Sequence, residues 1–332
     1  MRSRSAIAMA SHGGDMVLVD GLGAEGKAIL RKRSRGGEIV SHRLLDAPLA
    51  LPVAWWDGAN YIVGGLRCPG WEGEEATGLE WISSYCGTVT YSCFRWSGSE
   101  SAPDMIGEAD AGPFGLLSLA AAGERSALLR RAGGAGFVRV QTEASSARFD
   151  QIAFDSYAPG ICAEGSGYIA FALPPVSPSF PANPAPATDL RRFALSPSER
   201  EWSPQPVSAN DLRSFRDVVF AGCDGGEAVL VAHQSLTEVA YLGFSLGDPS
   251  EPPRIVKPKG LDPSSSLGMV GSHFVGLVRV AEPASFRLVA IESGVVLTLA
   301  DFPGWIEAPD VLAVSDFEVA YLSGGGRGSV QI

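Results

Sequence analysis

The sequence predicts an all-β fold and, more specifically, a seven-bladed β-propeller. One short hairpin pattern recurs seven times along the 332 residues. Glycine (40) and proline (23) are frequent and spread along the chain, which is typical of many short elements joined by many turns. No segment shows a sustained helical period. The apolar share of 45% is sufficient for a packed core, so the glycine and proline content does not indicate disorder.

Each copy of the pattern is an apolar run, a small turn rich in glycine, aspartate or serine, and a second apolar run. The near-continuous apolar runs are typical of strands that are buried on both faces. Glycine and aspartate in the turns tolerate the positive φ of tight hairpins. The spacing between copies is close to the roughly 40–50 residues of a four-stranded blade. The copies begin at Ser5, Pro52, Gly115, Pro159, Asp217, Leu267 and Asp310.

Further hairpins are expected in three of the intervals, where polar and apolar residues alternate. They cover Gly26–Leu45, Gly78–Trp96 and Phe286–Phe302. Alternation of this kind suits the outer, half-exposed strands of a blade. The two longest intervals contain insertions, at Cys68–Gly78 and Pro174–Asp189.

We therefore expect one propeller over residues 1–332. The last copy is short, so the last blade is expected either to be incomplete or to be closed by the N-terminus. A propeller of six or eight blades and a pair of β-sandwich domains are the competing architectures. The expected blades are approximately 1–47, 48–110, 111–155, 156–212, 213–262, 263–307 and 308–332.

The inner hairpin, with its Asp-Gly type of turn between two apolar strands, resembles that of TolB-like and WD40-like propellers. The Trp-Asp and Gly-His signatures of WD40 repeats are missing. The resemblance therefore implies a fold and no particular function.

Charge and cysteine usage restrict the partners and the location. The net charge of −11 argues against binding to nucleic acid or to an anionic membrane. No apolar stretch is long enough for a membrane span, and residues 1–20 lack the apolar core of a signal peptide. The five cysteines form no Cys-x-x-Cys pair, which favours free thiols in a cytoplasmic protein.

Aromatic residues are concentrated in the second blade, where five of the seven tryptophans lie between residues 55 and 96. Large aromatic rings either fill the space between blades or form a binding face. Trp71 is the strongest candidate for a partner contact, because its insertion is rich in glycine and glutamate. Paired carboxylates in that insertion are also compatible with acid–base catalysis or calcium, but their spacing favours a solvated loop. The candidate partner contacts are Trp55, Trp56, Trp71, Glu72, Glu74 and Glu75.

Two further groups of side chains are candidate sites. A basic run is interpreted as the charged face of an outer hairpin, although it also suits an acidic partner or a phosphate. His12 and His273 occupy equivalent turns of two copies, but no third metal ligand is evident, so no metal site is predicted. The basic run consists of Lys27, Arg31, Lys32, Arg33 and Arg35.

The sequence contains no Gly-x-Ser-x-Gly elbow and no phosphate-binding Gly-x-x-x-x-Gly-Lys loop. We therefore expect no cofactor and a non-enzymatic function. That function is a scaffold that binds one or more proteins, or an accessory subunit of a larger complex. Two alternatives stay open: a propeller hydrolase or lyase that acts on a carbohydrate or small ester at the central channel, and a lectin.

Overall fold

The computed structural model describes the chain except for a set of short segments and one long insertion. From residue 258 onward it describes the course of the strands. The residues outside the description are 1–6, 22–26, 35–37, 69–85, 87, 113–116, 132–135, 155–156, 174–186, 209, 225, 235–238, 258–265, 271–272, 281–284, 293–294, 304–309, 315–317, 324–325 and 332.

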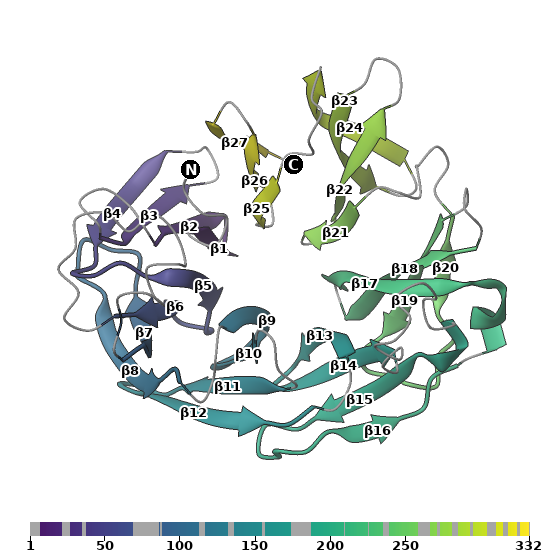
Figure 1. The fold of residues 1–332 in the computed structure, drawn as a ribbon, viewed down its shortest axis with the longest axis horizontal. Helices are drawn as coiled ribbons and strands as arrows, with labels where there is room; N and C mark the ends of the chain where they lie inside the picture. Colours follow the sequence, from purple (N-terminus) through teal and green to yellow (C-terminus); the bar gives the residue numbers. More distant parts are fainter. Residues whose placement is uncertain are drawn as a thin grey trace. The chain divides into compact units, whose positions relative to one another are not determined.

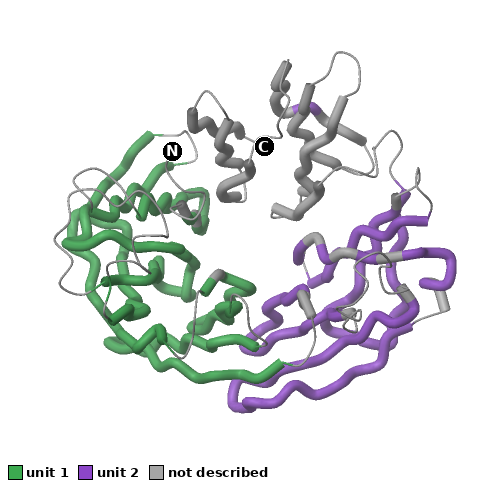
Figure 2. The backbone as a smooth tube through the Cα atoms, viewed as in Figure 1, with its two compact units in different colours: residues 1–154, 311–315 green, residues 155–310, 316–332 purple. Residues whose placement is uncertain are grey.

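The described strands form seven antiparallel sheets that follow one another along the chain (Figure 1). Six of these sheets have four strands and the last has three. Within each sheet the strands are neighbours in chain order, as expected when every connection is a hairpin or a short loop. The chain clusters into two compact units, residues 1–154 with 311–315 and residues 155–310 with 316–332 (Figure 2).

The first unit contains sheets 1 to 3. Sheet 1 consists of β1 (Ile7–His12), β2 (Asp15–Asp20), β3 (Ile29–Ser34) and β4 (Ile39–Leu44). Sheet 2 consists of β5 (Ala50–Trp56), β6 (Tyr61–Arg67), β7 (Thr90–Trp96) and β8 (Asp104–Asp110). Sheet 3 consists of β9 (Leu117–Gly123), β10 (Ser126–Arg131), β11 (Phe137–Thr142) and β12 (Ala147–Ile152).

The second unit contains sheets 4 to 6. Sheet 4 consists of β13 (Tyr157–Glu164), β14 (Gly167–Leu173), β15 (Arg191–Leu195) and β16 (Ser203–Gln205). Sheet 5 consists of β17 (Asp217–Asp224), β18 (Glu227–His233), β19 (Val239–Ser245) and β20 (Arg254–Val256). Sheet 6 consists of β21 (Ser266–Val270), β22 (His273–Val280), β23 (Ser285–Glu292) and β24 (Val295–Pro303). Two short 3₁₀ helices, η3 (Ala187–Asp189) and η4 (Asn210–Ser214), lie in its connections.

The last sheet consists of β25 (Asp310–Val314), β26 (Glu318–Ser323) and β27 (Gly326–Gln331). This sheet has three described strands, one fewer than the other six. The alternative expectation was closure of the last blade by the N-terminus. That segment, Met1–Ser5, lies outside the described residues.

The hairpin that recurs in the sequence is formed by the first two strands of each sheet, such as β1 and β2 in sheet 1. All seven copies form such a hairpin. In the first copy Gly13 and Gly14 form the turn with φ of 61° and 86°. Backbone of this kind is strained for residues that carry a Cβ, so the glycine pair selects the tight turn and fixes the register.

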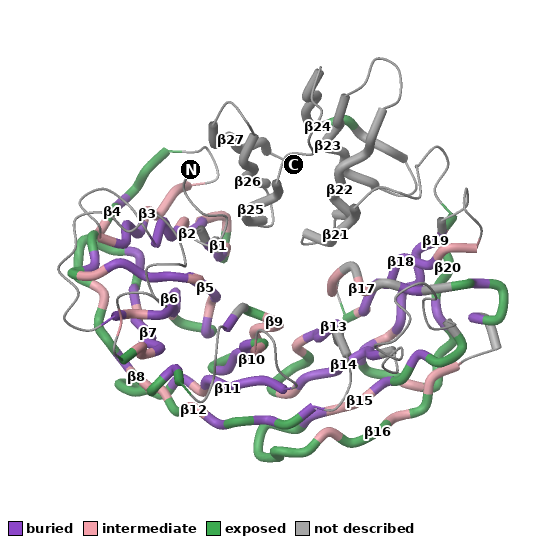
Figure 3. The backbone as a smooth tube through the Cα atoms, viewed as in Figure 1, coloured by how far each residue is buried: buried purple, intermediate pink, exposed green. Residues whose placement is uncertain are grey.

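In sheets 1 to 5, where side-chain burial is described, it follows the strand order (Figure 3). The second strands are buried along nearly their whole length, as β6 and β18 show, because both of their faces pack. The outer strands β4 and β8 are largely exposed, with one buried side chain each, and β4 lies in the hairpin Gly26–Leu45 that the sequence predicts to be half-exposed. Sheets 1 to 5 thus bury their inner strands and leave their outer strands largely in solvent.

One expected hairpin differs from the structure. The alternating pattern of Gly78–Trp96 predicts a hairpin within that segment, whereas β7 begins at Thr90 and pairs with β6 and β8. Residues 78–85 lie outside the described residues. β7 is a strand, in agreement with the alternating pattern. It pairs with β6 across the insertion and with β8 across a serine-rich turn.

The prediction that the cysteines are free thiols is wrong for four of the five. Cys68 pairs with Cys86 and Cys162 pairs with Cys223, with Cα–Cα distances of 5.6 and 5.7 Å. Only Cys93 is free, and it is buried. Spacing in the sequence does not reveal these pairs, because the partners are 18 and 61 residues apart and meet through sheet geometry.

Candidate partner-binding surface

The turns at one end of sheets 1 to 3 form a continuous surface. Antiparallel strands reverse direction at every turn, so the first and third turns of a sheet lie at the same end. Contacts described below join these turns from sheet to sheet. We call this the turn surface and define it by residues 12–15, 57–60, 97–101, 124–125 and 143–146.

Asp57 holds the turn between β5 and β6. Its Oδ1 accepts hydrogen bonds from the backbone N–H groups of Ala59 and Asn60, at 3.0 and 2.8 Å. The Thr142 hydroxyl of sheet 3 donates to Oδ2 at 3.3 Å, and the guanidinium of Arg95 lies 3.9 Å away. The carboxylate is 4% exposed, so these contacts replace the water that it loses on burial. Asp57 is thus committed to structure and is not available as a general acid or base.

Backbone groups join the same two sheets. The N–H of Arg125 donates to the carbonyl of Asp57 at 3.1 Å, and the N–H of Thr142 donates to the carbonyl of Arg125 at 2.8 Å. Arg125 has a φ of 55°, which places it in the left-handed region. The β9–β10 turn is therefore fixed from both sides by its own neighbours.

Arg95 carries the connection to the outer part of sheet 3. From β7 its guanidinium donates to the backbone carbonyls of Glu143 and Ala144, in the β11–β12 turn. Charge-assisted hydrogen bonds of this kind are the stronger class. The side chain thus joins the outer turn of sheet 3 to the buried carboxylate of Asp57.

An aromatic group joins sheet 1 to sheet 2 at the same end. The imidazole of His12 stacks on the indole of Trp56, with ring centroids 4.0 Å apart and an interplanar angle of 5°. Trp56 in turn meets the edge of Tyr61, with centroids 5.0 Å apart and an angle of 69°. His12 is exposed, Trp56 is half-buried and Tyr61 is buried. The stack therefore presents aromatic surface to solvent on a buried base.

The base of this stack is polar as well as aromatic. The Tyr61 hydroxyl lies 3.3 Å from the carbonyl of Asp15 and 3.5 Å from that of His12, as a donor. Burial, together with the negative charge of Asp15, raises the pKa of Tyr61 to about 12. The Asp15 carboxylate also forms an ion pair with Lys32 at 2.8 Å.

The candidate partner contacts of the sequence divide into three groups. Trp56 lies on the turn surface. Trp55, its neighbour, is 2% exposed and packs in the core of sheet 2, because adjacent residues of a strand point to opposite faces. The buried indole of Trp55 offers no surface to a partner. The remaining candidates, Trp71, Glu72, Glu74 and Glu75, lie outside the described residues.

The insertion that carries Trp71 is flanked by a disulfide. Cys68 follows β6 directly and its partner Cys86 precedes β7. The bond joins the chain immediately before and after residues 69–85. The β6–β7 connection leaves sheet 2 at the end opposite to the turn surface.

The structure places most of the other sequence candidates on strands. Lys32 pairs with Asp15, and Arg31, Lys32 and Arg33 lie on β3. Arg35 is outside the described residues. His12 ends β1 and His273 begins β22, and the described part of the chain contains no cluster of three or more metal-ligating side chains. None of its helices has the length and apolarity needed to cross a bilayer.

Comparison with known proteins identifies the fold. No protein-family model and no curated protein matches the sequence. Among solved structures, the β-propeller domain of the Trilobed protease from Pyrococcus furiosus matches with a TM-score of 0.53 and 11% identity, over 97% of this chain and 93% of that one. The fold is a β-propeller.

Two other solved structures agree with this propeller. The β-propeller domain of Cps50 (Swd1) from Myceliophteria thermophila has a TM-score of 0.53 and 9% identity, and the match covers 100% of this chain and 97% of that one. A prolyl endopeptidase has a TM-score of 0.55 and 12% identity, over 99% of this chain and 48% of that one. The propeller thus spans about half the length of that endopeptidase. At such low identities the likeness shows the fold alone.

Proposed function

We propose that this propeller is a protein-binding scaffold or an accessory subunit of a larger complex, and that it holds a partner on the turn surface. The observation that carries the proposal is the exposed His12–Trp56 stack, fixed on the buried Tyr61 at the junction of two sheets. Aromatic side chains that are held rigidly contribute disproportionately to protein interfaces.

The turns around the stack are ordered before any partner arrives. Asp57 and Arg95 connect three turns through hydrogen bonds to backbone groups. A surface that is already rigid loses little conformational entropy on binding, which favours affinity. These contacts support a role in recognition in preference to catalysis, because they use the buried carboxylate of Asp57 structurally.

The disulfide-flanked insertion is proposed as a second contact. Its sequence holds Trp71 with Glu72, Glu74 and Glu75, and it leaves sheet 2 at the end opposite to the turn surface. A scaffold that uses both ends of its sheets holds two partners at once. A partner for this loop is expected to carry a basic or aromatic surface.

The compartment is part of the proposal. The cysteine spacing favoured the cytoplasm, but disulfides persist mainly in oxidising compartments. Four of five cysteines are paired here. We therefore favour an oxidising compartment over the reducing cytoplasm.

The test is affinity purification of the tagged chain from its host after chemical crosslinking. Wild type, Trp56→Ala and Trp71→Ala are compared, with Met105→Ala as the matched control because Met105 is an exposed apolar residue on β8 that belongs to neither the turn surface nor the insertion. We expect one partner to be lost with Trp56→Ala, a second partner to be lost with Trp71→Ala, and the control to retain both. A set of partners that is the same for all four proteins contradicts the proposal.

A further inference from the structure

The outer strand of sheet 1, β4, is unlike the other described outer strands. Among the described side chains, six large apolar residues are exposed, and three of them lie in β4: Ile39, Val40 and Leu44, at 59%, 56% and 47%. β8 places acidic residues in solvent instead, and β16 and β20 are only three residues long. Proteins normally protect outer strands with charge, short length or proline.

One edge of β4 pairs with no other described strand. The other edge pairs with β3. The N–H of Leu45 donates to the carbonyl of Ala28 at 2.9 Å, on the β3 side. Because backbone groups alternate along an antiparallel strand, those of His42 and Leu44 point away from β3. This edge is the template that an added strand requires.

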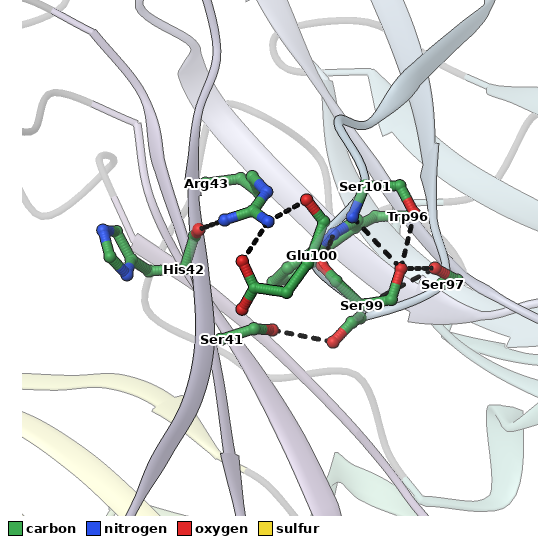
Figure 4. Close-up of polar contacts among 9 residues, drawn as sticks. Ser41, His42, Arg43, Trp96, Ser97, Ser99, Glu100 and Ser101 are labelled. Carbon is green, nitrogen blue, oxygen red and sulfur yellow. Dashed lines mark hydrogen bonds and ion pairs between the residues drawn. The ribbon is translucent and has the colours of Figure 1, made fainter.

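The strand is held in place by sheet 2. The Ser41 hydroxyl donates to the carbonyl of Gly98 at 2.7 Å, and the guanidinium of Arg43 bridges the Glu100 carboxylate, the Glu100 carbonyl and the carbonyl of His42 (Figure 4). The serine-rich turn that supplies these acceptors is itself ordered by hydrogen bonds among its hydroxyls. β4 is therefore a fixed edge, and its ordering costs nothing further when a partner binds.

The charge of the two outer strands selects the partner. β3 and β4 contain four cationic residues, Arg31, Lys32, Arg33 and Arg43, and no acidic one, in a chain whose net charge is −11. Lys32 forms an ion pair with Asp15 and Arg43 with Glu100, so these six side chains together keep a net positive charge. An acidic segment is attracted to this patch, and apolar residues that alternate with its acidic ones match Ile39, Val40 and Leu44. A second copy of the chain is disfavoured, because antiparallel pairing of two β4 strands brings the same cations together and both copies are acidic.

We propose that β4 accepts an extended segment of a protein partner, with alternating acidic and apolar residues, as an added fifth strand of sheet 1. The proposal rests on the function proposed above, in that the chain binds proteins, but it uses the outer edge of β4, which adjoins the turn surface at residues 98–100 and is not part of it. The backbone of the segment pairs with the outer edge of β4, and its side chains meet the apolar and cationic residues of β3 and β4.

The test measures binding of a short synthetic peptide in which glutamate alternates with valine, by fluorescence anisotropy with the full chain. A matched peptide in which lysine replaces glutamate is the charge control. Proline at residue 42 removes an outward N–H and leaves the pairing with β3 intact, because edge strands tolerate proline at such positions. We expect the glutamate peptide to bind, the lysine peptide to fail, and His42→Pro to weaken binding at least about tenfold.

A second variant keeps the test valid if His42→Pro does not fold. Leu44→Asp introduces a like charge and removes an apolar contact at the edge, and it is expected to weaken binding of the glutamate peptide to a similar degree. Met105→Asp, a change of similar exposure on β8, is expected to leave binding unchanged. Absence of binding by the glutamate peptide, or equal binding by wild type, His42→Pro and Leu44→Asp, overturns the proposal.

Two further measurements distinguish failure of the β4 proposal from failure of the proposed function, and a partner segment from a second copy of the chain. Trp56→Ala is expected to bind the glutamate peptide as wild type does, whereas it loses the partner of the turn surface. If Trp56→Ala loses that partner and the β4 variants change nothing, the proposed function stands and the β4 proposal fails. Sedimentation equilibrium tests whether a second copy of the chain binds β4. A dimer that His42→Pro converts to monomer shows that it does, and this result also overturns the proposal.

Discussion

The imidazole of His12 lies parallel to the indole of Trp56, with their centroids 4.0 Å apart, although the two residues belong to different sheets. The contact closes the gap between the β1–β2 turn and the end of β5. Tyr61 contacts the ring of Trp56 edge-on, and its hydroxyl points as a donor to the backbone carbonyl of His12. The rings of His12, Trp56 and Tyr61 thus connect sheet 1 to sheet 2 and also present aromatic surface to solvent.

A double-mutant cycle measures the contact between His12 and Trp56. We expect His12→Ala and Trp56→Ala to be coupled by about 1 kcal/mol in the free energy of unfolding, which is the usual range for aromatic pairs. The measurement is denaturant unfolding of wild type, both single variants and the double variant. Strictly additive effects of the two substitutions contradict a direct ring contact.

Removal of the Asp57 carboxylate is expected to destabilise the first unit more strongly. Asp57→Ala leaves the N–H groups of Ala59 and Asn60 and the guanidinium of Arg95 without the acceptor they share, at a cost of about 1–3 kcal/mol. Thr142→Val is the matched control, because it removes only one of the contacts and keeps the volume. Hydrogen exchange at the β5–β6 turn is expected to rise in Asp57→Ala and to change little in the control. Equal stability of Asp57→Ala and wild type argues against its role as organiser of the turns.

Alkaline pH is expected to weaken the fold through Tyr61. Its pKa is raised from 10.0 in the unfolded chain to about 12 in the folded one, mainly by burial. The folded state therefore keeps its proton longer, so the stabilisation is complete below pH 10 and is lost as the pH rises toward 12. Tyr61→Phe removes this ionisation, and its unfolding free energy is expected to fall less steeply with pH over that window. Parallel curves for the two proteins contradict the prediction.

The cysteines give a direct chemical test. Under non-reducing conditions the denatured chain is expected to react with a thiol reagent only at Cys93, and the native chain not at all, because Cys93 is fully buried. Burial also raises the pKa of the Cys93 thiol, which further lowers its reactivity. Five reactive thiols in the denatured chain disprove both disulfides.

The stability of the second unit is expected to depend on one of these bonds. Cys162 lies on β13 and Cys223 on β17, the first strands of neighbouring sheets, and the bond closes a loop with a sequence separation of 61. The chain-entropy model gives about 4 kcal/mol for a loop of that length. We expect Cys162→Ser with Cys223→Ser to lower the unfolding free energy by up to that amount, and Cys93→Ser to serve as the control without a lost bond.

The local elements of the fold were accessible from the sequence because each hairpin carries its own signal. The seven inner hairpins were predicted and are present, since an apolar run, a glycine or aspartate turn and a second run suffice to specify one. Gly13 and Gly14 illustrate this, because the two glycines adjoin in the sequence and directly form the turn. The strand order within each sheet follows the chain order.

What the sequence did not reveal depends on contacts between sheets. The segment Asp57–Asn60 reads as a hairpin turn, and nothing in it indicates that its carboxylate meets Thr142 of the next sheet. Trp55 and Trp56 are adjacent and equally apolar, so only the register of β5 decides which one is buried. The disulfide pairs were also not predicted, because Cys162 and Cys223 are 61 residues apart in the sequence and meet only when their strands pack.

The bond between Cys162 and Cys223 also determines what a protease can do to this chain. Any single cut between these two residues, including one in the proline-rich segment from 174 to 186, leaves both products covalently attached. A nicked molecule therefore migrates as one species on a denaturing gel until a reductant is added. The second unit can lose the continuity of its backbone without losing either piece.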